Sequence, residues 1–399
     1  MGEMSPLLLL DSEDVAWFRD ELTAARGAAA ALARRVGLDE QRAAEVALCV
    51  SEATGNLTKH AVDGSVLLRV VRTAQVAGVE VLTIDSGPGM ADVARSLRDG
   101  SSSTGTLGIG LGALARLADT LDIHSLPGRG TVMAARFWNR GTARGFATAE
   151  PAVAGLTRAI NGEQVCGDAW AARLDPGGDG DPSGTPPPFR TVRSSAGAEP
   201  GPAPSGVSWS ALTAAAGRRS TAAAPAPAPP GGGAAVMVML CDGLGHGPMA
   251  ALAGAAAVQA FRGSGARMPE EAVQEIHRAL RGTRGAAVAV ARVEPSTGRL
   301  LYCGVGNIAG VLLGAESRTG LVSLPGIVGH QLRGLRTFEQ TLPPGGALVM
   351  HSDGLTDRWS TDILPGLLHH SPLVAAGQLL RTAGIRHDDA GVVVAKGLW

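Results

Sequence analysis

Aromatic residues are scarce in this 399-residue chain: Phe, Trp and Tyr together make up 3% of it. Single-stranded nucleic acids are bound by stacking bases on aromatic rings and by an excess of positive charge. Here 35 basic residues stand against 36 acidic ones, for a formal net charge of -1. The composition therefore argues against a nucleic-acid partner.

Long apolar runs are lacking as well. The longest, such as residues 234–240, are far shorter than the roughly 20 residues of a membrane-spanning helix. The chain opens with Glu3 and Asp11 rather than with a basic segment. We therefore expect a soluble cytoplasmic protein with no membrane contact.

Cysteine is also rare, and no two cysteines form a CxxC pair. Each of the four lies alone in an apolar stretch: Cys49, Cys166, Cys241 and Cys303. This pattern predicts small buried apolar side chains rather than zinc ligands or disulfides.

The length suffices for two domains that each bury a core. Residues 175–233 hold about half of the 24 prolines and contain the run APAPAPPGGG, a composition that buries too little apolar surface to offset the entropy of ordering. Strand-like runs flank this flexible insert, over 170–174 and 234–240, and both belong with the aspartate motifs of the second domain. We therefore predict that the insert is an enlarged hairpin loop within that domain. We expect a first domain over 1–140, a linker over 141–150 and a second domain over 151–399.

The first domain alternates helices and strands, an α/β layer pattern. Asp39 is placed to cap a helix that runs through Ala61 with an apolar stripe at helical spacing. The other predicted elements are strands over 66–72, 79–84 and 131–137 and a helix over 111–121.

Three polar residues recur along the predicted helix after Asp39. Glu52, Asn56 and His60 are spaced at i, i+4 and i+8 and therefore share one stripe. A carboxylate there can orient or deprotonate an attacking hydroxyl, and an amide oxygen suits Mg²⁺. The spacing alone is also that of a solvated helix face.

Two glycine-rich segments follow. In DSGPGM, Asp85 can accept a hydrogen bond from the amino group of a base, while Gly87 and Gly89 allow backbone to approach a flat ring. A tight turn would have the same pattern. In GTLGIGLGA, residues 105–113, glycine amides run into a helix N-terminus that can bind phosphate oxygens. Gly128, Gly130 and Thr131 then supply a turn and a hydroxyl.

In this order the four elements resemble the N, G1 and G2 boxes and the closing GT of the GHKL ATPases. Residues 99–123 resemble the RsbT-type switch kinases and their anti-sigma-factor relatives, and the likeness covers roughly residues 10–138. It implies a Bergerat α/β sandwich that binds ATP with Mg²⁺ and phosphorylates a serine or threonine on a small STAS-domain protein. The first histidine is His60, inside the nucleotide motif, which argues against a histidine autokinase.

The resemblance also implies roles for single residues. Glu52 would be the general base, Asn56 the magnesium ligand and Asp85 the residue that reads adenine. The phosphate loop would consist of Gly108, Gly110 and Gly112, and the remaining nucleotide-binding positions would be His60, Gly87, Gly89 and Thr131.

Aspartates end four strand-like runs of the second domain. They are Asp168, Asp242, Asp353 and the pair Asp388 and Asp389. Carboxylates that converge from several strands, with no His or Cys cluster beside them, suit Mg²⁺ or Mn²⁺. Two such ions roughly 3.5–4 Å apart can clamp a phosphoryl group for in-line attack. A single aspartate before glycine is more often a turn residue.

The order and wording of these motifs resemble the SpoIIE and RsbX branch of the PPM serine/threonine phosphatases, over about residues 155–397. This implies an αββα sandwich with two Mn²⁺ or Mg²⁺ ions between its sheets. Asp242 would bridge the ions, the Gly243 carbonyl would complete one shell, Asp353 and Asp388 would hold one ion and Asp168 the other. The final motif departs from the usual DDxT, because Ala390 and Gly391 follow Asp389, and the choice between Asp388 and Asp389 stays open.

Two further residues near these motifs have more than one interpretation. His246 can assist protonation of the leaving hydroxyl or serve only in the turn. Asn307, in GVGNIAG, is predicted as a turn residue.

The sequence as a whole predicts an α+β fold and a bifunctional phospho-switch. Its kinase and phosphatase would act on a STAS-type or stressosome-like partner, with an anti-sigma factor as a further candidate partner. The alternative is a phosphatase regulated by a first domain that binds ATP without transferring phosphate.

Overall fold

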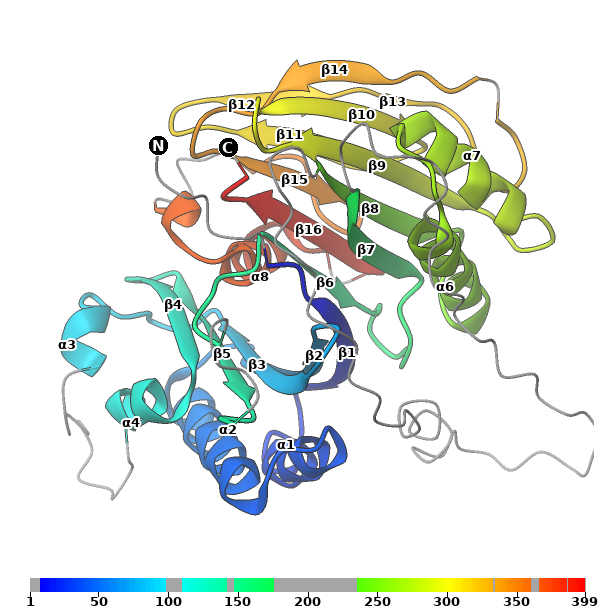
Figure 1. Ribbon diagram of the computed structural model, residues 1–399. Helices are drawn as coiled ribbons and strands as arrows, with labels where there is room; N and C mark the ends of the chain where they lie inside the picture. The colour runs from blue at the N-terminus through cyan, green and yellow to red at the C-terminus, as the bar shows by residue number, and fades with distance from the viewer. Residues whose placement is uncertain are drawn as a thin grey trace, which may run out of the picture.

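A computed structural model describes residues 8–97, 110–141, 147–175, 235–332, 334–359, 366–385 and 387–398. The described elements stack in alternating layers of helix and sheet (Figure 1). Within these ranges no helix combines the length and the apolar content needed to cross a bilayer.

The first half of the structure, residues 8–141, contains an antiparallel sheet with the strand order β1-β2-β3-β5-β4. Helices cover one of its faces, and their apolar residues share a core with alternate residues of the strands. The strands are β1 (Asp11–Phe18), β2 (Ser65–Arg72), β3 (Ala77–Asp85), β4 (Thr120–Leu126) and β5 (Gly130–Trp138), and the helices are α1 (Ala24–Arg35), α2 (Glu40–His60), α3 (Val93–Leu97) and α4 (Gly110–Leu117).

Helix α2 begins where the sequence predicts. The Asp39 carboxylate accepts a hydrogen bond from the Arg42 N–H at 2.7 Å, which satisfies a donor that the first helical turn leaves open. The helix predicted over 111–121 is wrong at its end, because α4 stops at Leu117 and Thr120 starts β4. Pairing of Thr120 with Arg136 on β5 supplies the backbone hydrogen bonds that a longer helix would have made locally.

The second half of the structure, within residues 147–398, contains two sheets packed face to face. The first has the order β13-β10-β9-β8-β7, with β14 beside β10, and the second has the order β12-β11-β15-β16-β6. The first comprises β7 (Asp168–Asp175), β8 (Ala235–Gly243), β9 (Ala286–Glu294), β10 (Arg299–Val305), β13 (Ser323–Leu324) and β14 (Phe338–Thr341). The second comprises β6 (Val153–Arg158), β11 (Ala309–Leu313), β12 (Arg318–Leu321), β15 (Ala347–His351) and β16 (Ala390–Lys396).

Helices close both outer faces of this pair of sheets. Helices α6 (Pro248–Gly263) and α7 (Pro269–Ala279) pack on the first sheet, and α8 (Pro372–Ala383) packs on the second after the 3-10 turn η2 (Leu367–His369). The αββα arrangement confirms the α+β fold expected from the sequence. Strands β7 and β8 pair directly up to Asp175 and Ala235; apart from Asp175, the predicted insert over 175–233 lies outside the described residues.

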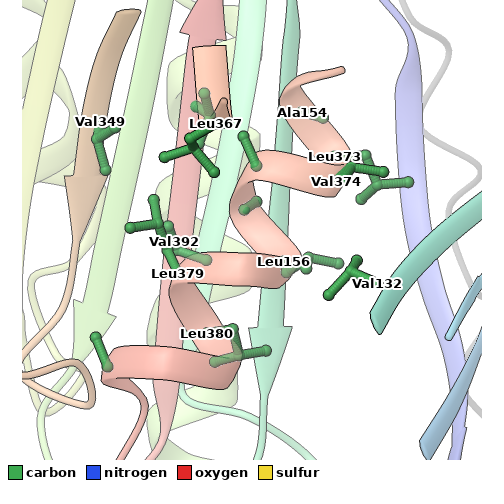
Figure 2. Close-up of a cluster of buried hydrophobic side chains, with 14 of the residues drawn as sticks. Val132, Ala154, Leu156, Val349, Leu367, Leu373, Val374, Leu379, Leu380 and Val392 are labelled. Carbon is green, nitrogen blue, oxygen red and sulfur yellow. The ribbon is translucent and has the colours of Figure 1, made fainter. Parts of the chain in front are cut away.

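Helix α8 is buried over residues 372–380. One face packs on β6 and β16, and the opposite face packs on β3, β4 and β5 of the first half. Figure 2 shows the result: Leu156 and Val392 approach the helix from the second half, and Val132 approaches it from the first. Gly377 is required at this crossing, since a Cβ there would lie 2.8 Å from Cγ1 of Val132. One apolar core therefore contains residues of both halves.

Buried polar groups join the same two halves beside α8. The Arg69 guanidinium is 1% exposed and donates to Asp14 at 2.6 Å, to Glu80 at 3.1 Å and to the Gly155 carbonyl of β6 at 2.8 Å. The Trp17 indole donates to the Thr157 carbonyl at 3.0 Å. Since a buried charge without partners costs several kcal/mol, these bonds hold β1 and β6 in one relative position.

We expect Leu379→Ala in α8 to lower the free energy of unfolding by about 2–5 kcal/mol, because it leaves a cavity in a core that cannot collapse around it. Urea unfolding followed by circular dichroism measures the change. The matched control is Leu252→Ala on α6, whose side chain is 61% exposed and whose loss should cost within about 0.5 kcal/mol. Equal effects of the two variants would contradict the central position of α8.

Candidate functional sites

The first candidate site lies at the ends of β7 and β8, where Asp168 and Asp242 stand directly opposite each other. Asp168 is 4% exposed, and its Oδ2 accepts a hydrogen bond from the Ser352 hydroxyl at 2.6 Å. Its Oδ1 is buried without a hydrogen-bond partner among the described residues. Buried carboxylate oxygens are rarely left without a partner. A bound cation is one partner that would satisfy this atom.

Asn307 connects two further carboxylates of this site. It lies in the turn between β10 and β11, and its Nδ2 donates to Asp242 at 3.1 Å and to Asp353 at 2.7 Å. The turn agrees with the sequence prediction, but the contact with the aspartates was missed. The signal that would have suggested this contact is a polar residue two positions after the end of β10, a buried strand in the sheet that carries Asp242.

The negative charges of the site repel one another. Burial, followed by the charge of Asp353, raises the pKa of Asp242 to about 6. Burial, followed by the charge of Asp242, raises the pKa of Asp168 well above the usual aspartate value. The site therefore holds more negative charge than its own donors neutralise.

The structure separates the two neighbouring aspartates that the sequence left open. Both carboxylate oxygens of Asp389 accept backbone N–H groups, from Ile160 and from Gly167, each at 2.7 Å. Asp389 is 3% exposed and fixes the loop that leads into Asp168. Asp388 is exposed; burial of part of the group raises its pKa, and the nearby charge of Asp353 adds to the rise. Backbone donors therefore occupy both oxygens of Asp389, whereas Asp388 is exposed.

Two other predicted positions border this cluster. A Cβ at Gly243 would lie 2.5 Å from the Ala250 carbonyl oxygen, so only glycine allows this close approach of the backbone. His246 is exposed, and its Nδ1 lies 3.2 Å from the Glu163 carboxylate.

The donor set fits hard divalent cations in its chemistry, since it is composed of oxygen atoms. Among the described residues, no three side chains of His, Cys, Asp or Glu are arranged to hold an ion as they stand. The amide of Asn307 spans two of the carboxylates instead. The unpartnered oxygen of Asp168 and the raised pKa values of Asp168 and Asp242 are what a cation would relieve.

The second candidate site lies at the end of β3 in the first half. The Asp85 carboxylate accepts the Gly87 N–H at 2.7 Å, and the Thr131 N–H is a further donor to it. Gly89 has φ of 65°, and a Cβ there would lie 2.1 Å from the Leu126 carbonyl oxygen. The predicted residues Asp85, Gly87, Gly89 and Thr131 are thus brought together.

Helix α2 reaches this site with its C-terminal end. A Cβ at Gly87 would lie 2.7 Å from the backbone carbonyl of His60. Of the stripe on α2, Glu52 and Asn56 are half-buried and the His60 side chain is exposed. The side chains of the predicted base and magnesium ligand are therefore accessible from solvent.

The predicted phosphate loop is described only in part. Gly108 lies outside the described residues. Gly110 starts α4 with φ of 72°, and a Cβ at Gly112 would lie 2.6 Å from the Leu97 carbonyl oxygen. The two described glycines therefore both have structural reasons to be glycine, and α4 begins where the loop was expected to meet a helix.

Helix α8 packs on β3, the strand that ends at Asp85, and the sequence gave no reason to expect this contact. Burial raises the pKa of Asp85, whereas the Gly87 and Thr131 N–H groups and the positive charge of Arg381 lower it. Arg381 of this helix lies 296 residues after Asp85 in the chain. Local sequence carries no signal of a contact at that separation.

Comparison with known proteins adds the family assignment. The family model described as "Histidine kinase-like ATPase domain" matches residues 19–137, and the model described as "Stage II sporulation protein E (SpoIIE)" matches residues 232–396. The serine/threonine-protein kinase RsbT of Bacillus subtilis (strain 168) is 30% identical over 120 residues, which are 30% of this chain and 90% of RsbT. The chain joins an RsbT-like ATPase domain to a SpoIIE-type phosphatase domain.

The second domain has a relative of its own. The phosphoserine phosphatase RsbX of the same organism is 25% identical over 118 residues, which are 29% of this chain and 59% of RsbX. Among solved structures, RsbX in complex with magnesium is 15% identical with a TM-score of 0.40, covering 61% of this chain and 94% of that one. The SpoIIE phosphatase domain with a regulatory fragment, from Bacillus subtilis, is 12% identical with a TM-score of 0.39, covering 81% and 79%.

These matches confirm the two resemblances and the fold class expected from the motifs. In general terms, the two families imply binding of ATP and of divalent metal ions. They do not identify the binding residues, whose roles remain predictions.

We expect the metal-free protein to lose stability as the pH rises from 5 to 7. The folded-state pKa of Asp242 is about 6, above the value of about 3.9 in the unfolded chain. Between these values the folded state binds a proton that the unfolded state has lost, so stability falls as that proton leaves. Urea midpoints measured in EDTA at both pH values test this.

Asp242→Asn should make this fall smaller, because it removes one titrating charge. Asp20→Asn, at an exposed aspartate just after β1, is the control and should retain the wild-type fall. Saturating Mn²⁺ should raise the midpoint at pH 7 in wild type, since a ligand that binds only the folded state stabilises it. An equal pH dependence in all three proteins would exclude repulsion at Asp242 as its cause.

Proposed function

We propose that the protein is a bifunctional phospho-switch in the cytoplasm. The SpoIIE-type domain removes phosphate from serine or threonine of a partner protein, and the RsbT-like domain transfers phosphate from ATP to such a partner. The observation that carries the proposal is the carboxylate cluster around Asp242, with the unpartnered oxygen of Asp168 at its centre.

In the phosphatase domain, two Mn²⁺ or Mg²⁺ ions would be held by Asp168, Asp242, the Gly243 carbonyl, Asp353 and Asp388. When bound, such ions supply an activated water and a clamp for the phosphoryl oxygens. The chain itself positions the ligands: Ser352 orients Asp168 through its hydroxyl, and Asn307 holds Asp242 and Asp353 at a fixed separation. His246, which is exposed beside Glu163, would protonate the leaving oxygen or serve only in the turn.

In the first domain, Asp85 would accept a hydrogen bond from the adenine amino group while Gly87, Gly89 and Thr131 border the ring. Asn56 would bind Mg²⁺ and Glu52 would deprotonate the attacking hydroxyl. Gly108, Gly110 and Gly112 would bind phosphate through backbone N–H groups at the start of α4, and His60 would close the other side.

The partner is proposed to be a STAS-type or stressosome-like protein. RsbT and RsbX are named as a serine/threonine kinase and a phosphoserine phosphatase of one organism, and this chain carries likenesses to both. Two opposing activities in one chain would be useful if they act on the same partner or on partners of one pathway. An anti-sigma factor is a further candidate.

The phosphatase assignment is tested by a matched pair of variants, Asp388→Asn and Asp389→Asn, with Asp242→Ala as reference. We expect Asp388→Asn to lose about 100-fold or more of the Mn²⁺-dependent activity on a phosphoserine STAS protein while its unfolding midpoint in EDTA stays unchanged. Asp389→Asn should lower that midpoint, because its carboxylate binds two backbone N–H groups. Turnover that Asp242→Ala leaves intact would refute the assignment.

The kinase assignment is tested with labelled ATP, Mg²⁺ and an unphosphorylated STAS protein. Asp242→Ala serves as background, since it should stop the label from being removed. We expect label on the partner in this background and at least about 100-fold less after Glu52→Ala is added. If no label reaches the partner while ATP binding is retained, the first domain does not transfer phosphate.

A second candidate function is favoured by the packing of α8. This helix of the phosphatase half packs on β3, the strand that ends at Asp85 of the nucleotide site, and its Gln378 donates to the His124 carbonyl of β4. This arrangement suits a first domain that senses an adenine nucleotide and regulates the phosphatase, with or without phosphate transfer.

A further inference from the structure

The loop between β6 and β7, residues 159–167, is held at both ends by one buried side chain. The Asp389 carboxylate accepts the Ile160 N–H at the start of this loop and the Gly167 N–H at its end, each at 2.7 Å. Hydrogen bonds to an ionised carboxylate are about twice as strong as bonds between neutral groups. Both ends of the loop are therefore fixed relative to β16, the strand that follows Asp389.

Glu163 lies at the tip of this loop and contacts a histidine from another segment. Its N–H donates to the Ile160 carbonyl at 3.1 Å, which closes a turn. Its carboxylate lies 3.2 Å from Nδ1 of His246. The Glu163 side chain is 33% exposed and the His246 side chain 58% exposed. An ion pair with this exposure adds at most about 1 kcal/mol to stability, so the fold has little use for the contact.

The turn that carries His246, residues 244–247, is also fixed. The Leu244 N–H donates to the backbone carbonyl just before β9 at 3.0 Å, and Gly247 is the residue that caps α6. Gly247 has φ of 75°, and a Cβ there would lie 3.2 Å from Oε1 of Glu163. The backbone beside His246 therefore leaves room for the Glu163 carboxylate and for little else.

Both segments border the carboxylate cluster. Asp168 directly follows the loop at 159–167, and Asp242 comes four positions before His246. The Gly243 N–H donates to the Gly167 carbonyl at 3.3 Å. This bond joins the two segments next to the aspartates that pair across β7 and β8. The contact between the histidine and the glutamate is therefore built from the same two segments that present those aspartates.

A carboxylate at one nitrogen of an imidazole decides what the other nitrogen can do. An ionised carboxylate only accepts hydrogen bonds, so Nδ1 of His246 is the donor in its contact with Glu163. The Nδ1 proton stays in this bond and the ring is held in one orientation, as in other carboxylate–histidine pairs. The proton that His246 can transfer is then the one on Nε2.

We propose that Glu163 is a positioning residue of the phosphatase site, which orients His246 so that its Nε2–H protonates the serine or threonine oxygen that leaves phosphorus. The inference rests on the proposed phosphatase function. A water oxygen bonds to phosphorus while the bond from phosphorus to the side-chain oxygen breaks, and the electron pair stays on that oxygen. The oxygen takes the Nε2 proton, and the neutral ring keeps its Nδ1–H bond to Glu163. The proton lost by the water returns to Nε2 through solvent.

The leaving group gives the test, because p-nitrophenolate leaves as a stable anion, whereas a serine oxygen must be protonated. The full chain with Mn²⁺ is assayed on a synthetic phosphoserine peptide and on p-nitrophenyl phosphate. On the peptide we expect kcat to fall about 100-fold in His246→Gln and about 10-fold or more in Glu163→Ala. The KM for the peptide should stay within about 2-fold of wild type. On p-nitrophenyl phosphate both variants should keep kcat within about 2-fold of wild type.

Further variants separate positioning from loss of structure. Glu163→Gln keeps an oxygen acceptor for Nδ1, so it should recover part of the peptide activity that Glu163→Ala loses. The double variant of Glu163→Ala and His246→Gln should be no slower than His246→Gln alone, because residues that act as one unit do not contribute additively. Glu316→Gln removes an exposed carboxylate between β11 and β12 and should match wild type on both substrates.

NMR of the histidine ring nitrogens, recorded with Mg²⁺, detects the contact without turnover. In the neutral ring of wild-type His246 we expect the proton on Nδ1. In Glu163→Ala we expect it on Nε2, which is the form that an imidazole without such a partner prefers. The signal is assigned by its loss in His246→Gln.

Three results would overturn the inference and leave the phosphatase assignment intact. The first is an equal loss on both substrates in Glu163→Ala, which would mark a structural role. The second is a Glu163→Ala variant with unchanged peptide activity and an unchanged ring proton. The third is wild-type peptide activity in His246→Gln. If wild type hydrolyses neither substrate, the phosphatase assignment fails and the inference fails with it.

Discussion

The rest of the structure depends on the burial of α8 between two sheets. Helix α8 is buried over residues 372–380, so both of its faces must be covered, and each sheet covers one side of it (Figure 1). The sheet of the RsbT-like domain consequently has α2 on one face and a phosphatase helix on the other. The hydrogen bonds of Arg69 and Trp17 then fix the angle between the domains. The two candidate sites of this protein are therefore held in one body.

Charge repulsion governs the phosphatase site in a similar way. Opposite positions on β7 and β8 bring Asp168 and Asp242 together, and the loops after β10 and β15 add Asn307 and Asp353. The fold pays for this crowding with raised pKa values and one unpartnered oxygen. Asp389 is the contrasting case. Each of its two carboxylate oxygens accepts a backbone N–H group, and these bonds fix the loop that leads into Asp168.

Much of the fold and of both sites could be predicted from the motifs and their periodicity. The cap at Asp39, the strands around 66–72 and 79–84 and the aspartates at strand ends are local features, and local features leave local signals. The helix over 111–121 was predicted too long because the pairing of β4 with β5 overrides the helical pattern after Leu117. The interpretation of Asn307 was incomplete for a related reason: a turn is local, whereas its contacts with Asp242 and Asp353 are not.

The sequence by itself determined which chemical groups are present and in what order, and hence the two families and the α+β fold. Only the tertiary structure decided which groups meet. It gave Asp388 and Asp389 different surroundings, placed Asn307 between two carboxylates and packed α8 on β3. The physical reason is that motif spacing reports on residues a few positions apart, whereas these contacts join residues tens to hundreds of positions apart and follow from how the layers pack around α8.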